Sequence, residues 1–328
     1  MKKVTIIGGG SWGLALSQVL TDNKNEVLIY DNDTEKIKKI NNRKHPFLDI
    51  LLPINIKATE NLKQALSFSN FIFLSIPTQN MRSLLKQINL IIDFPKNFIN
   101  TSKGIEYKSN KIISQILKEE IDINKIQNYA YISGPSHAEE VIIRKITFIE
   151  VISLKKSFAL QIAKLLSNPN YFKVIISNDI TGSEICSSFK NALSLVSGIL
   201  DSHNFSDNAK SAFITLGLKE MKLILNLFSS NSEKTVLSLS GVGDLIVTSF
   251  NKKSRNYQFG QKIKLGESIT NILKNSKQTI EGIHNLKVFY NLAIQNKIKL
   301  PIIENAYQVI FKKKSIKFLL KHIFEQIE

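Results

Sequence analysis

Cysteine and long apolar runs are almost absent from this chain of 328 residues. Its single cysteine, Cys186, cannot form an internal disulfide, which is typical of proteins from a reducing cytoplasm. No apolar run approaches the roughly 20 residues that span a bilayer, and no signal peptide follows the N-terminal Met-Lys-Lys. The five histidines show no metal-ligand spacing with one another or with the cysteine. These absences predict a cytoplasmic protein without stable membrane insertion and without a metal site.

Arginine is also scarce, with four arginines among the 44 basic residues of a chain whose formal net charge is +17. Proteins that read nucleic acids favour arginine and interleaved aromatic residues, whereas the lysines here are spread along the whole chain. We therefore interpret the charge as mainly compositional and expect no nucleic-acid partner. Part of it can still steer an anionic substrate.

A glycine-rich turn near the N-terminus is the clearest motif. The apolar run at residues 4–7 predicts a short buried strand, and Gly8, Gly10 and Gly13 then fit the pattern G-x-G-x-x-G ahead of a helical pattern. In such a turn the first glycine permits the tight bend and the second lets the backbone approach a pyrophosphate. The third lets the helix pack close to the sheet. Because N–H groups at a helix start bind phosphate, the sequence predicts a dinucleotide site here.

An acidic residue, Asp31, ends the next apolar run, roughly 20 residues beyond the turn, where a ribose-binding carboxylate is expected. A carboxylate there accepts a hydrogen bond from the ribose 2′-OH and repels a 2′-phosphate, and Asn32 supplies no cation. We therefore expect NAD or NADP, with NAD slightly favoured, although Lys36, Arg43 or Lys44 can reach a phosphate.

The alternation of strand and helix patterns up to residue 178 predicts an α/β fold with a doubly wound sheet. We expect strands over residues 4–7, 26–31, 71–76, 98–101, 129–132, 148–152 and 172–176. Helical patterns then take over at 179–202, 209–228, 288–296 and 316–327. The sequence thus predicts an N-terminal Rossmann-type dinucleotide-binding domain at residues 1–178 and an all-α C-terminal substrate and catalytic domain at residues 179–328.

Nine short motifs follow one another along nearly the whole chain. They are Gly8-Gly9-Gly10-Ser11-Trp12-Gly13, Ile76-Pro77-Thr78-Gln79, Ser102-Lys103-Gly104-Ile105, Ser133-Gly134-Pro135-Ser136-His137-Ala138-Glu139-Glu140, Phe189-Lys190-Asn191, Gly217-Leu218-Lys219-Glu220-Met221, Gly241-Val242-Gly243-Asp244-Leu245, Ser254-Arg255-Asn256 and Ile280-Glu281-Gly282. In their joint order and spacing the chain resembles NAD(P)-dependent glycerol-3-phosphate dehydrogenase of the bacterial cytoplasmic type.

The resemblance implies a Rossmann domain and a helical domain with the site in the cleft between them, and a homodimer. It implies reduction of dihydroxyacetone phosphate to sn-glycerol 3-phosphate with NAD(P)H, a product that feeds phospholipid synthesis.

The resemblance gives catalytic roles to three residues. Lys190 matches the general acid/base, Lys103 matches a second cation near substrate and cofactor, and Asp244 matches an acceptor for a substrate hydroxyl or a partner for Lys190. Ketone reduction develops charge on the carbonyl oxygen, so it needs such a proton donor and cationic stabilisation. Without the resemblance, a lysine in a helix is ordinarily a solvated charge, and Asp244 is ordinarily a helix cap.

A phosphate monoester also needs a charged clamp, and Ser254-Arg255-Asn256 offers a hydroxyl, a guanidinium fork and an amide in a row. The resemblance implies substrate binding by Lys103, Gly134, Ser136, Lys190, Asn191, Asp244, Ser254, Arg255 and Asn256. It implies cofactor binding by Gly8, Gly10, Ser11, Trp12, Gly13, Asp31, Asn32, Phe47, Lys103, Ala138, Arg255, Thr279 and Glu281. Trp12 either covers the cofactor or packs in the core.

The chain departs from the family pattern at four places, one of which is Asn32, where the family often has arginine. His137 replaces the usual phenylalanine, and we expect it either to pack as a substitute for that ring or, as the alternative, to perturb Lys190. Leu216 stands where the family commonly has arginine, and residues 41–54 match the family only loosely, through Phe47-Leu48.

Two other functions stay open. Hydroxyacyl-CoA and 6-phosphogluconate dehydrogenases share the architecture and a Lys-Asn pair, but the strings Gly-Val-Gly-Asp-Leu and Ser-Arg-Asn argue against them. The other alternative is a basic nucleotide-sensing or nucleic-acid-binding protein that has kept a Rossmann shell, against which the intact set of site residues argues.

Overall fold

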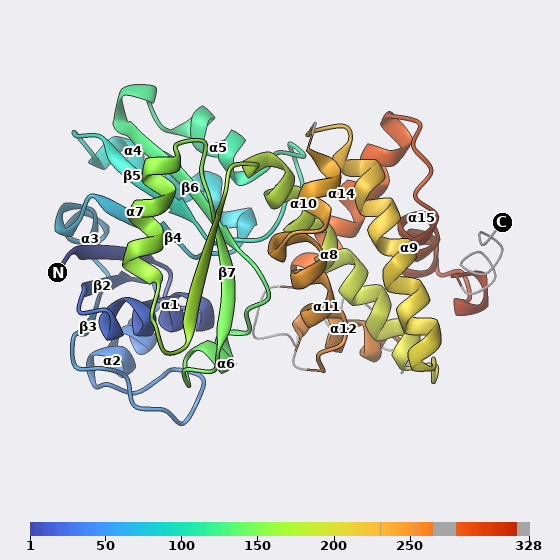
Figure 1. Cartoon of the computed structure of the whole chain (residues 1–328), viewed down its shortest axis with the longest axis horizontal. Coiled ribbons are helices and arrows are strands. Elements are labelled where there is room, and N and C mark those ends of the chain that lie inside the picture. Colours follow the sequence, from blue (N-terminus) through green and yellow to red (C-terminus); the bar gives the residue numbers. More distant parts are fainter. Residues whose placement is uncertain (230, 253, 265–279, 320–328) are drawn as a thin grey trace. The chain divides into compact units, whose positions relative to one another are not determined.

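The structure is a computed structural model that describes residues 1–229, 231–252, 254–264 and 280–319 (Figure 1). The chain divides into two compact units. The first comprises Met1–Ser102 and Ile113–Ile180, and the second comprises Lys103–Ile112 and Thr181–Glu328. A single division after residue 178, as we predict from the sequence, does not set apart the segment Lys103–Ile112, which belongs to the helical unit.

The first unit is built on an eight-stranded sheet with the order β3-β2-β1-β4-β5-β6-β7-β8. Its strands are β1 (Lys3–Ile7), β2 (Glu26–Tyr30), β3 (Ile56–Thr59), β4 (Phe71–Leu74), β5 (Lys96–Asn100), β6 (Ile126–Ser133), β7 (Thr147–Ile152) and β8 (Phe172–Ser177). Neighbouring strands pair in parallel except β6 and β7, which are antiparallel. The order of the first six strands is that of dinucleotide-binding sheets, so the predicted Rossmann-type fold is confirmed. The reversal at β7 and the short strand β3 were not predicted.

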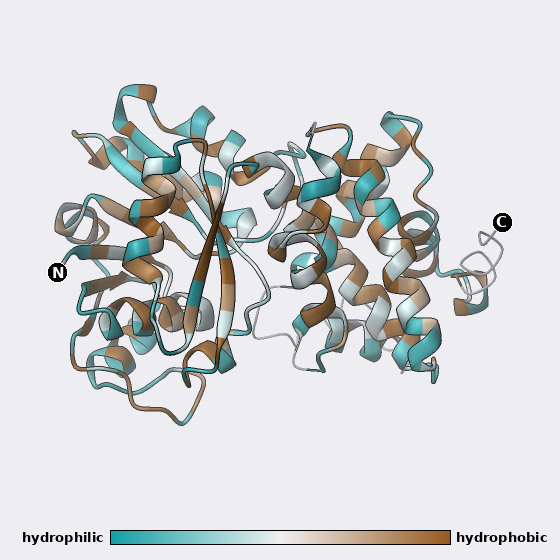
Figure 2. Ribbon diagram, viewed as in Figure 1, coloured by the Kyte–Doolittle hydropathy of each residue, from teal (hydrophilic) through white to brown (hydrophobic). Residues whose placement is uncertain are grey.

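Helices bury both faces of this sheet. They are α1 (Ser11–Asp22), α2 (Thr34–Asn41), α3 (Leu62–Phe68), α4 (Met81–Ile91), α5 (Ile113–Glu120), α6 (Ala138–Val141) and α7 (Lys156–Leu166). One apolar cluster joins the sheet to α1, α2, α6 and α7, and another joins it to α3, α4 and α5. Burial on both faces explains why strands such as β4 and β7 are largely apolar, and much of the sheet is brown ribbon in Figure 2.

The second unit is helical, as predicted. Its described helices are α8 (Ile180–Asp201), α9 (Asp207–Leu225), α10 (Ser232–Val236), α11 (Asp244–Ser249), α12 (Arg255–Lys264), α14 (Glu281–Gln295) and α15 (Pro301–Lys312), with a π-helical segment at Leu239–Gly243. The predicted helices at 179–202, 209–228 and 288–296 are present with shifted ends, and α15 was not predicted. Of the helix predicted at 316–327, residues 316–319 are helical and the remainder lies outside the described residues.

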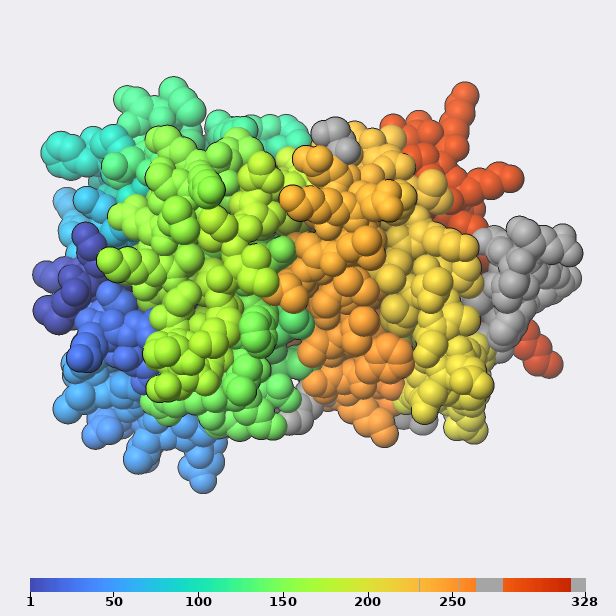
Figure 3. All heavy atoms as spheres, in the orientation of Figure 1, coloured from blue at the N-terminus to red at the C-terminus, as the bar shows by residue number. Residues whose placement is uncertain are grey.

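The helix α8 forms the centre of this unit, because its apolar residues share one core with residues of α9, α14 and α15. Side chains of α9, yellow in Figure 3, form part of the surface that this view shows. None of the helices in the described ranges has both the length and the hydrophobicity that crossing a membrane requires.

Helices α8 and α12 approach each other through glycine. A Cβ atom at Gly198 would lie 2.0 Å from the carbonyl oxygen of Tyr257, and one at Gly260 would lie 2.1 Å from that of Leu195. No larger residue fits either position without a backbone shift, so this contact holds α12 close to the C-terminal part of α8.

Candidate active site

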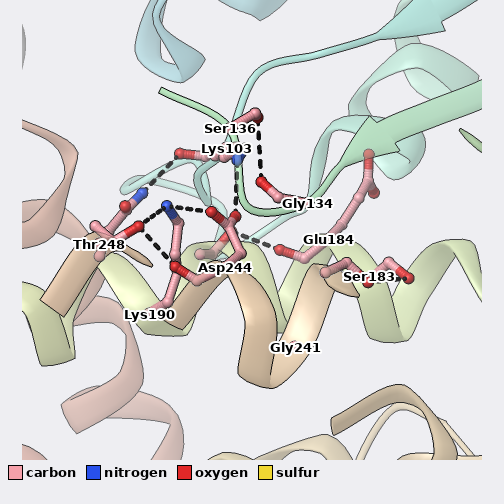
Figure 4. Close-up of polar contacts among 12 residues, drawn as sticks. Lys103, Gly134, Ser136, Ser183, Glu184, Lys190, Gly241, Asp244 and Thr248 are labelled. Atoms are coloured by element: carbon pink, nitrogen blue, oxygen red, sulfur yellow. Dashed lines mark hydrogen bonds and ion pairs between the residues drawn. The ribbon is translucent and has the colours of Figure 1, made fainter. Parts of the chain in front are cut away.

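Two lysines share one carboxylate in the second unit. The Nζ atom of Lys103 lies 2.7 Å from Oδ2 of Asp244, and the Nζ atom of Lys190 lies 3.0 Å from Oδ1 (Figure 4). Lys190 also donates to Oγ1 of Thr248 at 2.6 Å, and that hydroxyl donates to the carbonyl oxygen of Asp244 at 2.7 Å. The three residues that we predict to be catalytic therefore lie together, with one net positive charge among them.

Local sequence explains how each member reaches this position. Lys190 extends from the middle of α8 within a buried polar stripe that also contains Glu184, Ser187, Asn191 and Ser194. Asp244 is the first residue of α11, where the helix dipole favours a carboxylate, and Thr248 follows one turn later. The side chain of Lys190 is 6% exposed, that of Asp244 1% and that of Lys103 18%, so only Lys103 has substantial access to solvent.

This environment perturbs both charged partners. Burial lowers the pKa of Lys190 to about 8, and the positive charges of Lys103 and Arg255 act in the same direction, while Asp244 partly opposes them. Burial alone would raise the pKa of Asp244, but the two lysines outweigh it and hold that pKa below its usual value. A lysine with a pKa near neutrality can both donate and accept a proton, which is the property required of a general acid/base.

A chain of side-chain amides holds Lys103 in place. Asn191 donates to the carbonyl oxygen of Lys103 at 3.2 Å, and Asn256 donates to the amide oxygen of Asn191 at 3.1 Å. The amide oxygen of Asn256 in turn accepts from the backbone N–H of Gly282, at the start of α14, at 2.9 Å. Both amides, which we predict to bind substrate, thus also fix the backbone around the lysine pair.

The Ser254-Arg255-Asn256 string begins α12. Ser254 is buried, and its Oγ lies 3.0 Å from Oγ of Ser194, which donates to the carbonyl oxygen of Thr248. Arg255 is exposed at the first position of the helix, and its charge acts on Lys190. The string therefore places one exposed guanidinium and a helix N-terminus in the electrostatic neighbourhood of the lysine pair.

In the first unit the glycine turn has the geometry that the sequence predicts. Gly8 has a φ of +113°, and a Cβ atom there would lie 2.3 Å from the carbonyl oxygen of Ser75. A Cβ atom at Gly13 would lie 2.1 Å from the carbonyl oxygen of Gly8, whereas one at Gly10 would meet nothing within 4 Å. The backbone of Gly10 thus borders open space at the start of α1.

Two features of this turn fit a dinucleotide. Gly10 caps α1 without a side-chain hydrogen bond, which leaves the first N–H groups available to phosphate oxygens. The indole Nε1 of Trp12 is buried and has no hydrogen-bond partner among the described residues. An orphaned donor beside an uncapped helix start is the arrangement expected where a polar ligand completes the hydrogen bonding.

Asp31 has a structural role that the sequence did not reveal. Its Oδ2 accepts from the backbone N–H of Gly9 at 2.8 Å, and its Oδ1 accepts from that of Asp33 at 2.9 Å. Lys36 lies 3.5 Å from Oδ1. The carboxylate therefore braces the glycine turn, and Asn32 beside it is exposed.

The remaining predicted site residues lie in several places. Ser11 is the first residue of α1, Ala138 is the first residue of α6, and Phe47 is 43% exposed in the loop between α2 and β3. Ser136 donates to the carbonyl oxygen of Gly134, which has a φ of +140°. Glu281 is the first residue of α14, and Thr279 lies outside the described residues.

Two of the departures from the family pattern have simple structural settings. His137 is half-buried at the N-cap of α6, and Leu216 packs against the core of the second unit. Leu216 therefore has a packing role where an arginine would bring a charge.

Sequence reasoning missed Thr248 and Asn285. Thr248 lies four residues after Asp244, a helical spacing that brings side chains together and that could have indicated it. Asn285 is fully buried, donates to the carbonyl oxygen of Ser188 at 2.8 Å and accepts from the backbone N–H of Ile105. These two hydrogen bonds connect the Lys103–Ile112 segment to α8, and no local sequence pattern predicts this role.

Comparison with known proteins agrees with this geometry. The N-terminal model of NAD-dependent glycerol-3-phosphate dehydrogenase matches residues 3–159, and the C-terminal model matches residues 179–321. A glycerol-3-phosphate dehydrogenase (NAD(P)+) of Phytoplasma mali is 52% identical over 324 residues, which are 99% of this chain and 97% of that protein. Its namesake in Acholeplasma laidlawii is 41% identical over 321 residues, 98% of this chain and 96% of that protein.

A solved structure of a protein with the same name is also similar to this chain. Glycerol-3-phosphate dehydrogenase of Coxiella burnetii matches with a TM-score of 0.88 and 27% identity, over 100% of this chain and 99% of that one.

A glycine turn on a Rossmann sheet and a helical unit with a buried lysine–carboxylate pair define an NAD(P)-dependent dehydrogenase. Within that class, the chain belongs to the NAD-dependent glycerol-3-phosphate dehydrogenase family. The resemblance drawn from the nine motifs is confirmed.

Proposed function

We propose that this chain reduces dihydroxyacetone phosphate to sn-glycerol 3-phosphate with NAD(P)H, and that Lys190 is the proton donor. The observation that carries the proposal is the buried Lys190, paired at 3.0 Å with Asp244 and held at a pKa of about 8. Family membership supports the substrate class.

The nicotinamide dinucleotide would be held by the glycine turn and by residues around it. Gly10, Ser11 and Gly13 would offer backbone N–H groups to the pyrophosphate, and Trp12 would contribute its indole N–H. When bound, the reduced nicotinamide supplies a hydride to the ketone carbon of the substrate.

Lys190 completes the reduction by giving its proton to the carbonyl oxygen, which becomes the secondary hydroxyl. Lys103 stabilises the negative charge that develops on that oxygen. Asp244 keeps both ammonium groups in place and accepts a hydrogen bond from the product hydroxyl. The neutral Lys190 that remains takes up a proton from solvent before the next turnover.

Arg255 would bind the phosphate of the substrate. A guanidinium offers two parallel N–H donors to phosphate oxygens, and the start of α12, which has no acidic residue in its first turn, adds backbone donors. Ser254 and Asn256 flank it in the sequence, and Gly134 and Ser136 are further substrate contacts in this proposal.

We favour NADH over NADPH. Asp31 uses three of its roughly four acceptor positions, two for backbone N–H groups and one for Lys36, so it can still accept from a ribose hydroxyl. A measurement of kcat/KM with each cofactor checks this, and a clear preference for NADPH would refute it. We further propose a cytoplasmic homodimer whose product enters phospholipid synthesis.

The test of the function is a substrate panel. With NADH or NADPH, the purified chain should oxidise the cofactor in the presence of dihydroxyacetone phosphate. It should be inactive with 3-oxoacyl-CoA and, with NAD(P)+, with 6-phosphogluconate. Activity with either of these and none with dihydroxyacetone phosphate would contradict the proposal.

A further inference from the structure

A buried histidine organises the loop between α2 and β3. The Nδ1 atom of His45 accepts from the backbone N–H of Phe47 at 3.1 Å and from that of Leu48 at 3.0 Å. The backbone N–H of His45 donates to the carbonyl oxygen of Ile50 at 3.0 Å, which closes the loop on itself. His45 is only 6% exposed, so its ring is the internal support of residues 45–50.

These two hydrogen bonds define the protonation state of the ring. Two backbone N–H groups point at Nδ1, so Nδ1 must carry a lone pair and the proton must be on Nε2. Protonation would put a second N–H group at Nδ1, facing two donors. The cationic ring therefore cannot keep either hydrogen bond.

The loop and the start of α1 pack against one apolar cluster. Leu48 and Ile50 pack against the same apolar cluster as Trp12 and Ala138, two residues that we assign to the dinucleotide site. Phe47, also assigned to that site, is 43% exposed and makes an edge contact with the His45 ring, with centroids 5.8 Å apart. The shape imposed by His45 therefore determines where Phe47 lies.

Burial and a nearby charge act on the pKa of His45 in opposite directions. Burial lowers its pKa below the ordinary 6.5, whereas the carboxylate of Glu139 on α6 raises it. Within its own loop, Arg43, Lys44 and Asp49 are the neighbouring charged residues, and the guanidinium of Arg43 is bonded to the carbonyl oxygen of Leu52. The ring is thus neutral at pH 7, and its lowered pKa means that it gains a proton only at a pH below its ordinary value of 6.5.

We propose that His45 is a positioning residue of the dinucleotide site, whose neutral ring holds Phe47 against the cofactor and whose protonation releases the loop and weakens cofactor binding. The proposal rests on the proposed cofactor role of the glycine turn. It assigns a pH dependence to cofactor affinity that is separate from the titration of Lys190, because the two groups titrate on opposite sides of neutrality.

Two substitutions of His45 test separately whether the loop needs a hydrogen-bond acceptor at Nδ1 and whether it needs a group that titrates. In His45→Asn the amide oxygen takes the place of Nδ1 and can accept the same two hydrogen bonds, but it does not titrate. In His45→Gln the amide lies one bond further out and cannot accept them. We would measure the Kd of NAD+ and NADP+, which are stable in acid, by calorimetry between pH 5.5 and 8, with thermal melting as a check of folding.

The wild-type Kd should rise as the pH falls below 6.5 and His45 gains its proton, by up to about tenfold, as expected for the loss of one or two neutral hydrogen bonds. His45→Asn should bind like wild type at pH 7.5 and show a much flatter profile, and His45→Gln should bind about tenfold more weakly at pH 7.5. The role of His45 would be overturned if the Kd of His45→Asn had the same pH dependence as that of wild type. It would also be overturned if His45→Gln bound the dinucleotides as tightly as wild type at pH 7.5. Folded wild type that binds neither dinucleotide at pH 7.5 would overturn the cofactor function itself.

Discussion

Lys103 and Asp244 lie 141 residues apart in the sequence and 2.7 Å apart in space, and both belong to the second unit. The contact exists because the ten residues Lys103–Ile112, which leave the sheet after β5, pack with the helices. One carboxylate thereby neutralises one of two neighbouring cations, and the other positive charge remains for an anionic substrate.

Asp244→Asn should lower the free energy of unfolding and change the pH dependence of kcat/KM. Removing the carboxylate leaves two ammonium groups close together with no counter-ion, which should cost on the order of 3 kcal/mol in the free energy of unfolding. The pKa of Lys190 should fall further below about 8, because the one charge that raises it is gone. Urea unfolding and the pH dependence of kcat/KM measure the two effects. Asp207→Asn, at a side chain that is 98% exposed, is the matched control.

The reaction should have a direction-dependent pH profile. Lys190 with a pKa of about 8 is protonated below that pH, so kcat/KM for ketone reduction should be level in neutral solution and fall above pH 8. Alcohol oxidation needs the neutral amine and should instead increase through the same range. Initial rates in both directions between pH 6 and 10 check this. A reduction rate that stays constant to pH 10 would show that the acid is another group.

Arg255→Ala should lower kcat/KM for dihydroxyacetone phosphate without unfolding the protein. Arg255 is exposed, and loss of a charged hydrogen-bond pair with phosphate should lower kcat/KM by about ten- to a hundredfold. Arg255→Lys should recover only part of this, since an ammonium lacks the planar fork. Lys252→Ala, at an exposed cation nearby in the sequence, should leave kcat/KM unchanged. Equal kcat/KM values for Arg255→Ala and wild type would show that Arg255 does not bind the substrate phosphate.

Glu220 should make the stability of the second unit depend on pH. This buried side chain of α9 accepts from the backbone N–H groups of Ile302 and Ile303 at the start of α15. Burial raises its pKa to about 8, and Glu304 adds to the shift. The folded chain therefore binds a proton that the unfolded chain releases between the ordinary value of 4.5 and about 8. Stability from this group is complete below pH 4.5 and is lost as the pH rises to about 8.

Glu220→Gln removes this titration. The free energy of unfolding of wild type relative to the variant should decrease from pH 5 to pH 8 and then level off. Glu233→Gln, at a side chain that is 75% exposed, should follow wild type at every pH. Parallel curves for wild type and Glu220→Gln would contradict the raised pKa.

The sequence predicts the features that depend on local patterns. The apolar runs identify most of the sheet, because strands buried on both faces leave no room for polar residues. The strand β3 escapes this reasoning, since only Ile56 and Ala58 in Ile56–Thr59 are buried apolar residues. Helix α15 begins with Pro301 in its first turn, and a proline at that position is a sequence signal for the start of a helix.

Features that depend on the tertiary fold could not be predicted in the same way. The direction of the pKa shift of Lys190 is set by burial, which outweighs Asp244 54 residues away. The hydrogen bond from the backbone N–H of Gly9 to Asp31 depends on how two loops pack, and the spacing of the residues suggests only a ribose contact. Asn191 shows the same limit, because its bond to the Lys103 carbonyl spans 88 residues.

The most direct test of the account compares wild type with Lys190→Ala and Lys190→Arg in steady-state reduction of dihydroxyacetone phosphate. Removing a positioned proton donor should lower kcat by about 10²–10⁴-fold, while the Kd of NADH changes little. Lys190→Arg should also be poor, because a guanidinium does not release its proton. Lys219→Ala, at an exposed lysine of α9, serves as the control with normal turnover. The account is contradicted if either variant of Lys190 keeps more than about a tenth of wild-type kcat, a smaller loss than any expected for a proton donor.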